Sequence, residues 1–209
     1  MFCRRAGFAR DLPALHRLAS GMRYNTGMER FDFAHRPDAE LFDSAFELVK
    51  ASFPPSEYRY RDTLLGMLDW PTYAMYIEHQ ASRATGLICS HEFGGMRFVE
   101  TFCISPGLRG AGRGGRMLDE YVSLCPGPVV LEVEPPEDEL TRRRVGFYRR
   151  HGFELDERDY VMPPLEPELP PLRLLLMSTQ PLGADFDAVR DAIYRTVYRV
   201  EPRDVPRLG

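Results

Sequence analysis

Residues 108–115 read LRGAGRGG, a segment whose backbone N–H groups can bind a phosphate. Two known patterns overlap in these letters. From Gly110 they fit G-x-G-x-x-G, which binds dinucleotides, and from Arg109 they fit R-x-x-G-x-G. Glycine lets a backbone approach a ligand closely, and the first N–H groups of a helix have no intrahelical partner. The segment therefore predicts a phosphate-binding loop, and the elements around it must decide which phosphate it binds.

Residues able to move a proton lie downstream of this loop. Glu132 and Glu134 alternate along the apolar stretch 129–134, so strand periodicity puts both on one face. Tyr148 stands in the segment F-Y-R-R-H-G-F. Carboxylates within an apolar strand are costly unless they are solvated or paired. This predicts either a polar cleft or a pairing with Arg143 or Arg144.

Length and composition predict an α/β (α+β) fold, and the hydrophobic periodicity predicts three antiparallel strands before the glycine loop. Before the loop we expect a strand over 31–34, a helix between Pro37 and Pro54, a helix over 58–68, and strands over 73–78, 85–91 and 97–104. Gly94-Gly95 predicts a hairpin turn. After the loop we expect a helix over 114–124, a strand over 129–134, a helix over 139–151 ended by Gly152, strands over 153–155, 159–162 and 172–178, and a helix over 186–200.

The dinucleotide interpretation of the loop conflicts with these surroundings. In its favour, Glu132 lies about 20 residues past the glycines, in the next strand, where such proteins bind a ribose. Against it, residues 105–109 separate the preceding strand from the first glycine, and an antiparallel meander precedes the loop. Only one clear strand–helix repeat follows Glu134. A nucleoside-triphosphate loop is excluded because no G-K-[ST] follows.

The stretch from Glu100 to Phe153 resembles the GNAT superfamily of acetyl-CoA-dependent N-acetyltransferases. The matching elements, in order, are T-F-C-I-S-P, R-G-A-G-R-G, V-V-L-E-V-E and F-Y-x-x-x-G-F, and the flanking elements extend the likeness to residues 29–162. The phrases F-P-P-S-E, L-E-V-E-P-P-E-D-E and R-R-V-G-F-Y look like a bacterial subgroup. The resemblance implies a GNAT-like fold, with a mixed, mostly antiparallel central sheet flanked by helices and a βαβ coenzyme A-binding unit. It also implies acetyl transfer from acetyl-CoA to a primary amine in a ternary complex.

The resemblance also assigns the residues that would bind acetyl-CoA, the implied co-substrate. The strand before the loop would bind the pantetheine arm through main-chain atoms, and the loop would bind the pyrophosphate. We read Cys103 as a core residue, and Thr141 stands where the family often has an asparagine that touches the cofactor. The implied contacts are Phe102, Cys103, Ile104, Arg109, Gly110, Ala111, Gly112, Arg113, Gly114, Gly115 and Thr141.

Acyl transfer to an amine needs a base, a donor to the oxyanion and an acid beside the sulfur. By resemblance, Tyr148 is the acid, and Glu132 matches the catalytic glutamate in the L-E-V strand of ribosomal-protein acetyltransferases. Glu100 is a second candidate for the base, and Glu134 or a water molecule stays open. On the substrate side we expect Tyr58 and Arg59, from the loop between the two early helices, and also Glu134.

Composition limits the remaining possibilities. The net charge of −4 gives no reason to expect a nucleic acid partner, and no apolar run approaches the roughly 20 residues that cross a bilayer. The four cysteines are widely spaced, which indicates no metal site and a reducing cytoplasm. His79 and His91 fall at strand ends and are interpreted as surface residues.

We expect a single domain over residues 29–209, preceded by an arginine-rich extension over 1–28 that is disordered or not native. The final helix covers the sheet or forms a homodimer, and the sequence leaves both open. Two other functions stay open beside acetyl transfer. One is a non-catalytic acyl-CoA-binding or interaction module, and the other is a dinucleotide-binding oxidoreductase.

Overall fold

A computed structural model describes residues 23–25 and 27–208 and shows one seven-stranded sheet in the order β1-β2-β3-β4-β5-β7-β6. Every neighbouring pair of these strands is antiparallel except β4 and β5, which run parallel. This mixed sheet confirms the predicted fold class and differs from the parallel sheet of a dinucleotide-binding fold. The strands are β1 (Met28–Phe31), β2 (Tyr73–Gln80), β3 (Arg83–Phe93), β4 (Met96–Ile104), β5 (Val129–Val133), β6 (Glu154–Met162) and β7 (Leu172–Ser178).

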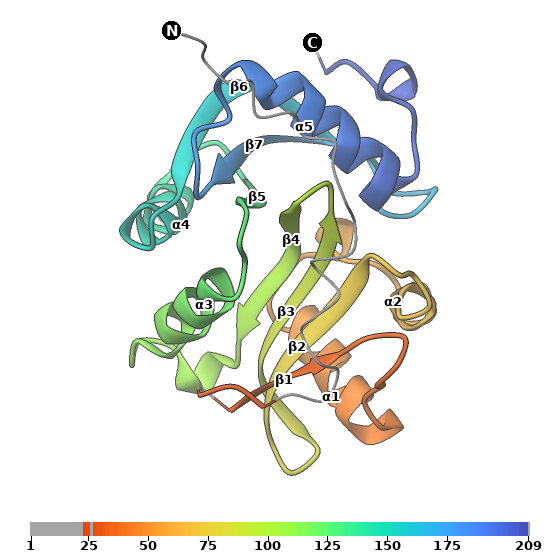
Figure 1. Cartoon of the computed structure of the whole chain (residues 1–209), viewed down its shortest axis with the longest axis vertical. Helices are drawn as coiled ribbons and strands as arrows, with labels where there is room; N and C mark the ends of the chain where they lie inside the picture. The colour runs from red at the N-terminus through yellow and green to blue at the C-terminus, as the bar shows by residue number, and fades with distance from the viewer. Residues whose placement is uncertain (1–22, 26, 209) are drawn as a thin grey trace, which may run out of the picture.

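Helices cover both faces of the sheet. The core clusters place α1, α2 and α5 on one face, and α3 and α4 on the other (Figure 1). The helices are α1 (Ala39–Lys50), α2 (Arg61–Met67), α3 (Arg113–Ser123), α4 (Glu139–Arg150) and α5 (Phe186–Ile193). A π-helical turn, η5 (Tyr194–Tyr198), continues α5, and short 3₁₀ turns are η2 (Pro55–Glu57), η3 (Pro106–Leu108), η4 (Gly183–Asp185) and η6 (Pro202–Asp204). In the described residues, no helix is both long and apolar enough to span a membrane.

Local chemistry explains where the helices begin and end. The Asp38 carboxylate accepts a hydrogen bond from the Leu41 N–H at 2.8 Å and caps α1. Asp138 caps α4 in the same way and forms a capping box with Thr141. Gly152 follows α4 with φ of +83°, as the sequence predicts for the end of this helix.

The first strand lies earlier than expected. It ends at Phe31 because the Asp32 carboxylate accepts hydrogen bonds from the N–H groups of Ala34 and His35, which turns the chain. Met28 is fully buried in β1, so the folded domain includes residues before 29. Most of the predicted extension, residues 1–22, lies outside the described residues.

The parallel pair β4 and β5 is joined over three residues only, Arg97–Val99 against Val129–Leu131. The pairing of β3 with β4 also slips at this point, because Cys89 pairs with Thr101 and Ser90 with Val99, which leaves Glu100 as an extra residue. Such bulges redirect a side chain and interrupt pairing. Beyond Val99 the β5 side of β4 is unpaired, and this divergence positions the site.

Candidate active site

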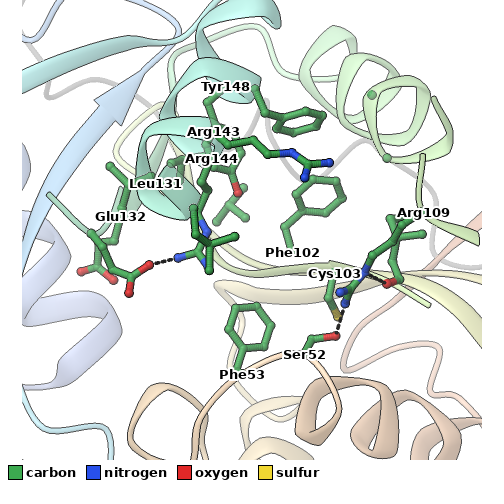
Figure 2. Close-up of a pocket in the computed structure, with 18 of the residues that line it drawn as sticks. Ser52, Phe53, Phe102, Cys103, Arg109, Leu131, Glu132, Arg143, Arg144 and Tyr148 are labelled. Carbon is green, nitrogen blue, oxygen red and sulfur yellow. Dashed lines mark hydrogen bonds and ion pairs between the residues drawn. The ribbon is translucent and has the colours of Figure 1, made fainter. Parts of the chain in front are cut away.

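A cavity of about 550 Å³ lies where β4 and β5 diverge, between the glycine loop and α4. Figure 2 shows Arg109 at one end and Glu132 at the other, with Tyr148, Arg143 and Arg144 along α4 between them. The structure brings most of the predicted site residues to this cavity: Glu100, Phe102, Cys103, Ile104, Arg109, Gly110, Gly112, Arg113, Gly114, Gly115, Glu132, Glu134 and Tyr148.

Four predicted site residues do not line the cavity. Thr141 is buried and bonded to Asp138 in the α4 cap, and the Ala111 carbonyl accepts a hydrogen bond from the Arg116 side chain. Two of the three predicted substrate contacts also make their contacts elsewhere. Tyr58 packs edge-on against Phe46 with ring centroids 6.1 Å apart, and Arg59 is buried in an ion pair.

The glycine loop has the backbone conformation that its sequence predicts. Gly110 and Gly112 have φ of +88° and +71°, in the left-handed region that suits glycine, and α3 begins at the next residue, Arg113. Gly115 is required for a different reason, since a Cβ there would lie 2.7 Å from Cε1 of His151. The first turn of α3 lines the cavity, and the first N–H groups of a helix have no intrahelical partner.

The arginine side chains of the loop bond to neighbouring parts of the protein in addition to carrying positive charge. The Arg109 side chain donates hydrogen bonds to the Ile104 carbonyl at 2.9 Å and to the Ser52 hydroxyl at 3.1 Å. Arg113 donates to the buried Glu78 carboxylate at 2.6 Å. Arg143, on the opposite wall, makes no ion pair with any residue that the structure describes. Its positive charge is therefore available to an anion in the cavity.

Tyr148 projects from α4 into the middle of the cavity (Figure 2). Burial is the main reason that the pKa of its hydroxyl is raised to about 12. The nearby Arg144 charge lowers this pKa, and Cys103 raises it. Within residues 23–25 and 27–208 this hydroxyl has no hydrogen-bond partner. It is a protonated donor at neutral pH, free to bond to a bound molecule.

Glu132 differs from an ordinary carboxylate. Burial raises its pKa to about 7, although hydrogen bonds from Tyr160 and Tyr198 act in the opposite direction. A carboxyl group with a pKa near neutrality can accept a proton at working pH. The two tyrosines were not anticipated from the sequence, because no local pattern connects them to a strand 28 and 66 residues away.

Glu100 is less suited to accept a proton. Burial alone would raise its pKa, but the Arg59 guanidinium and His91 hold it at about 2. The Arg59 Nε donates to Glu100 Oε1 at 2.7 Å, and His91 Nε2 lies 3.6 Å from Glu100 Oε2. His91 is fully buried, so its interpretation as a surface residue is wrong. It lies on the covered side of β3, where Tyr73 packs against its ring at 5.2 Å.

Glu134 forms the ion pair that the sequence expected for one of the two strand glutamates, with Arg144 as its partner. Glu57, from η2, also lines the cavity, and burial together with the nearby Glu134 raises its pKa. Glu57 belongs to the F-P-P-S-E phrase, but the sequence alone does not single it out as a site residue. These carboxylates make this end of the cavity acidic.

Cys103 is a core residue, as predicted. It packs in the cluster beneath α1, and burial raises the pKa of its thiol to about 12 although Ser52 and Arg109 lower it. A thiol with that pKa stays protonated near neutrality and is a poor nucleophile.

Solved structures resemble this fold closely. A GNAT-family acetyltransferase from Bacteroides thetaiotaomicron is 32% identical with a TM-score of 0.75, over 83% of this chain and 99% of that chain. Escherichia coli ElaA matches with a TM-score of 0.54 at 13% identity, over 73% of this chain and 99% of that chain. An aminoglycoside 6'-N-acetyltransferase complexed with coenzyme A matches with a TM-score of 0.51 at 15% identity, over 74% of this chain and 97% of that chain.

No protein-family model matches the chain, and no curated protein sequence does. The last two structures share the fold alone, whereas the Bacteroides protein shares both fold and sequence over almost its whole length. Together with the glycine loop, the diverging strands and the mixed sheet, that likeness shows that this chain belongs to the GNAT family of acetyltransferases.

Proposed function

We propose that this protein is an N-acetyltransferase that transfers an acetyl group from acetyl-CoA to a primary amine by direct attack. The observation that supports it most is that the glycine loop, Tyr148 and Glu132 line one cavity. An anion site, a proton donor and a proton acceptor are the three parts that this reaction needs.

The cavity fits the two ends of coenzyme A chemically. The first N–H groups of α3 have no intrahelical partner, and the Arg143 guanidinium makes no ion pair in the described part of the chain. Both suit a pyrophosphate at the loop. Along β4, Phe102 and Ile104 lie opposite Ile88 and Gly86 of β3, and no described strand pairs with the other edge of β4 at this point. Main-chain groups on that open edge can therefore pair with the amides of an extended pantetheine arm. The acidic end of the cavity, with Glu132, suits a cationic amine.

In the reaction, the Glu132 carboxylate removes a proton from the ammonium form of the acceptor, directly or through one water molecule. The neutral amine attacks the thioester carbonyl carbon, and a C–N bond forms as the carbonyl becomes an oxyanion. Collapse of this intermediate breaks the C–S bond, and the Tyr148 hydroxyl gives its proton to the departing sulfur. The attacking nitrogen also loses its second proton to solvent, and the Tyr148 oxygen regains a proton from solvent. The products are an acetamide, the free thiol and one net proton, which is the proton that Glu132 took from the ammonium group and then releases.

The proposal excludes an acyl-cysteine intermediate. Cys103 is the cavity cysteine, and its protonated thiol faces the α1 side of the sheet. The transfer therefore takes place with acetyl-CoA and the amine bound together.

Ligand binding tests the anion site first. In thermal-shift titrations, acetyl-CoA should raise the melting temperature, while NADH and NADPH at equal concentrations should leave it unchanged. Stabilisation by the nicotinamide cofactors alone would overturn the proposal.

Thiol release then tests turnover. The assay uses acetyl-CoA with a panel of amines, namely spermidine, tyramine, kanamycin and a peptide that begins with alanine. Coenzyme binding with no thiol release above the acceptor-free rate for any amine would instead indicate a non-catalytic acyl-CoA-binding module.

A further inference from the structure

Two tyrosine hydroxyls converge on the Glu132 carboxylate from elements that are remote in sequence. The Tyr198 hydroxyl, from η5, lies 2.8 Å from Oε1 and 2.7 Å from Oε2. The Tyr160 hydroxyl, from β6, donates to Oε1. Both tyrosine side chains are buried, so packing holds the two hydroxyls at the carboxylate.

The sheet and the π-helical turn place these hydroxyls. Glu132 pairs with Leu176 on β7, and Tyr160 pairs with Leu174 on the same strand, so the two side chains lie on one face with β7 between them. The chain leaves η5 through Arg199, a non-glycine residue with φ of +58°. Single π-helical turns are rare and occur often at functional sites.

Arg59 and Trp70, which are remote from this turn in sequence, contact it and hold it in place. The Arg59 Nη2 donates to the Val197 carbonyl at 3.1 Å, and the Arg59 guanidinium lies 5.9 Å from the centre of the Tyr198 ring. The Arg199 guanidinium lies 4.1 Å from the centre of the Trp70 ring. Tyr198 is therefore held in place by contacts that do not involve Glu132.

We propose that Tyr198 and Tyr160 are positioning residues that orient the Glu132 carboxylate and stabilise its charged form for proton abstraction. This inference rests on the proposed role of Glu132 as the base. It predicts that the two hydroxyls act through Glu132 and not through the bound substrates.

The charges around Glu132 show why these hydroxyls matter. Besides Tyr160 and Tyr198, Glu100 from β4 and Arg59 from the segment before α2 act on it, with Glu100 raising its pKa and Arg59 lowering it. Burial is the largest influence and raises the pKa to about 7. Hydrogen bonds to a charged carboxylate lower its pKa, so removing a hydroxyl must raise the pKa further. Glu132 would then be protonated, and inactive as a base, over more of the neutral range.

A direct titration of Glu132 tests this without any acceptor. In the full-length protein labelled with ¹³C at glutamate side chains, the Glu132 carboxyl signal is assigned by its loss in Glu132→Gln. We expect its midpoint to rise by about one pH unit in Tyr198→Phe and in Tyr160→Phe. Tyr194→Phe is the matched control, because Tyr194 is in the same turn but donates to the Val161 carbonyl at 2.8 Å. Its midpoint should match the wild type.

The pH dependence of kcat/KM gives the catalytic readout. The acid limb should move upward in Tyr198→Phe by the same amount as the titration midpoint, while acetyl-CoA affinity stays unchanged. In a Glu132→Gln background, the Tyr198→Phe change should cause no additional loss, because coupled residues are not additive. Melting temperatures identify a variant that fails to fold, and Tyr160→Phe then serves in its place.

The possible outcomes separate the two proposals. Unshifted titration midpoints in both phenylalanine variants overturn the positioning role, even when wild-type acetylation is found. A full additional loss in the double variant also overturns it, because the hydroxyls would then act on something other than Glu132. Shifted midpoints in a protein that acetylates no amine support the hydrogen-bonding role and contradict the proposed function alone.

Discussion

The Nε of Arg59 lies 2.7 Å from Oε1 of Glu100, and both side chains are more than nine-tenths buried. The same guanidinium donates to the Leu165 and Val197 carbonyls, at 3.2 and 3.1 Å. Arg59 thus joins the segment before α2 to β4, to the β6–β7 connection and to η5. A residue that the sequence suggested for substrate binding instead holds four parts of the site together.

Replacing Arg59 should therefore lower the stability of the folded protein. Arg59→Met leaves the buried Glu100 charge unpaired, and we expect the free energy of unfolding to fall by about 3–5 kcal/mol. Urea denaturation at pH 7 measures it. Adding Glu100→Gln should recover much of the loss, because the orphaned charge is then removed. Arg61→Met is the control, since its pair with Asp43 is exposed and should cost about 1 kcal/mol or less.

The raised pKa of Glu132 predicts a stability that falls as pH rises. Its folded pKa of about 7 lies above the ordinary value of 4.5, so between these pH values the folded protein binds more protons than the unfolded chain. The stabilisation is complete below about pH 4.5 and is lost as pH rises through about 7. Glu132→Gln should therefore be more stable than the wild type at pH 8, by about 1–3 kcal/mol.

Urea denaturation at pH 5 and pH 8 checks this expectation. The advantage of Glu132→Gln should shrink strongly at pH 5. Glu154→Gln, which changes an exposed carboxylate on β6, should show no such dependence on pH. An equal difference between Glu132→Gln and wild type at both pH values would contradict the assigned pKa direction.

Tyr148→Phe should separate binding from turnover. The hydroxyl has no partner in the described part of the chain, so its removal leaves no buried group unsatisfied and should change stability little. If Tyr148 protonates the departing sulfur, kcat should fall by about 10²–10⁴. Acetyl-CoA affinity, measured by calorimetry, should stay within a factor of about three. A variant with wild-type kcat removes Tyr148 from the mechanism.

The left-handed conformation of Gly112 predicts sensitivity of the loop to a single methyl group. An alanine at φ of +71° is strained by roughly 1–2 kcal/mol, which should deform the loop. We expect Gly112→Ala to weaken acetyl-CoA binding by about tenfold or more. Gly66→Ala in α2 is the comparison, because nothing lies within 4 Å of its added Cβ and helical alanine is favourable. It should bind acetyl-CoA normally.

Two arginines of the cavity should respond in opposite ways. Arg113 pairs with Glu78, whose side chain is 2% exposed, so Arg113→Met should lower the free energy of unfolding by about 2–3 kcal/mol. Arg143→Gln removes a charge without an ion pair in the described residues, so stability should be unchanged while acetyl-CoA affinity drops about tenfold. Equal losses of affinity with unchanged stability in both variants would contradict the structural role of Arg113.

The parts that sequence predicted correctly depend on local chemistry. The glycine loop, the Gly94-Gly95 hairpin, the helix ended by Gly152 and the strand over 172–178 all follow from residues that act on their own backbone or on neighbours in the chain. The family resemblance depends on the same stretch, which is why it pointed to the loop and to Tyr148 together.

Only the tertiary structure decided which charged side chains are buried and paired within the protein. His91 reads as a strand-end surface residue, yet packing against Tyr73 and Glu100 buries it completely. From the sequence, Arg59 is interpreted as a substrate-side loop residue, yet it is paired with a carboxylate 41 positions away. The burial of these two residues depends on elements from distant parts of the chain that pack against them, and a local sequence pattern does not identify those elements.

The site itself depends on the divergence of two strands. Leu131 and Val133 pack toward α3 and α4, as Tyr148 does, whereas Glu132 between them faces the opposite side of the sheet. In a continuously paired sheet, Glu132 and Tyr148 would be separated by the backbone. The sequence predicted a phosphate-binding loop, an acid and a base in this chain. Only the three-residue pairing of β4 with β5 opened one cavity to both faces, because strand separation is a non-local property of the folded sheet.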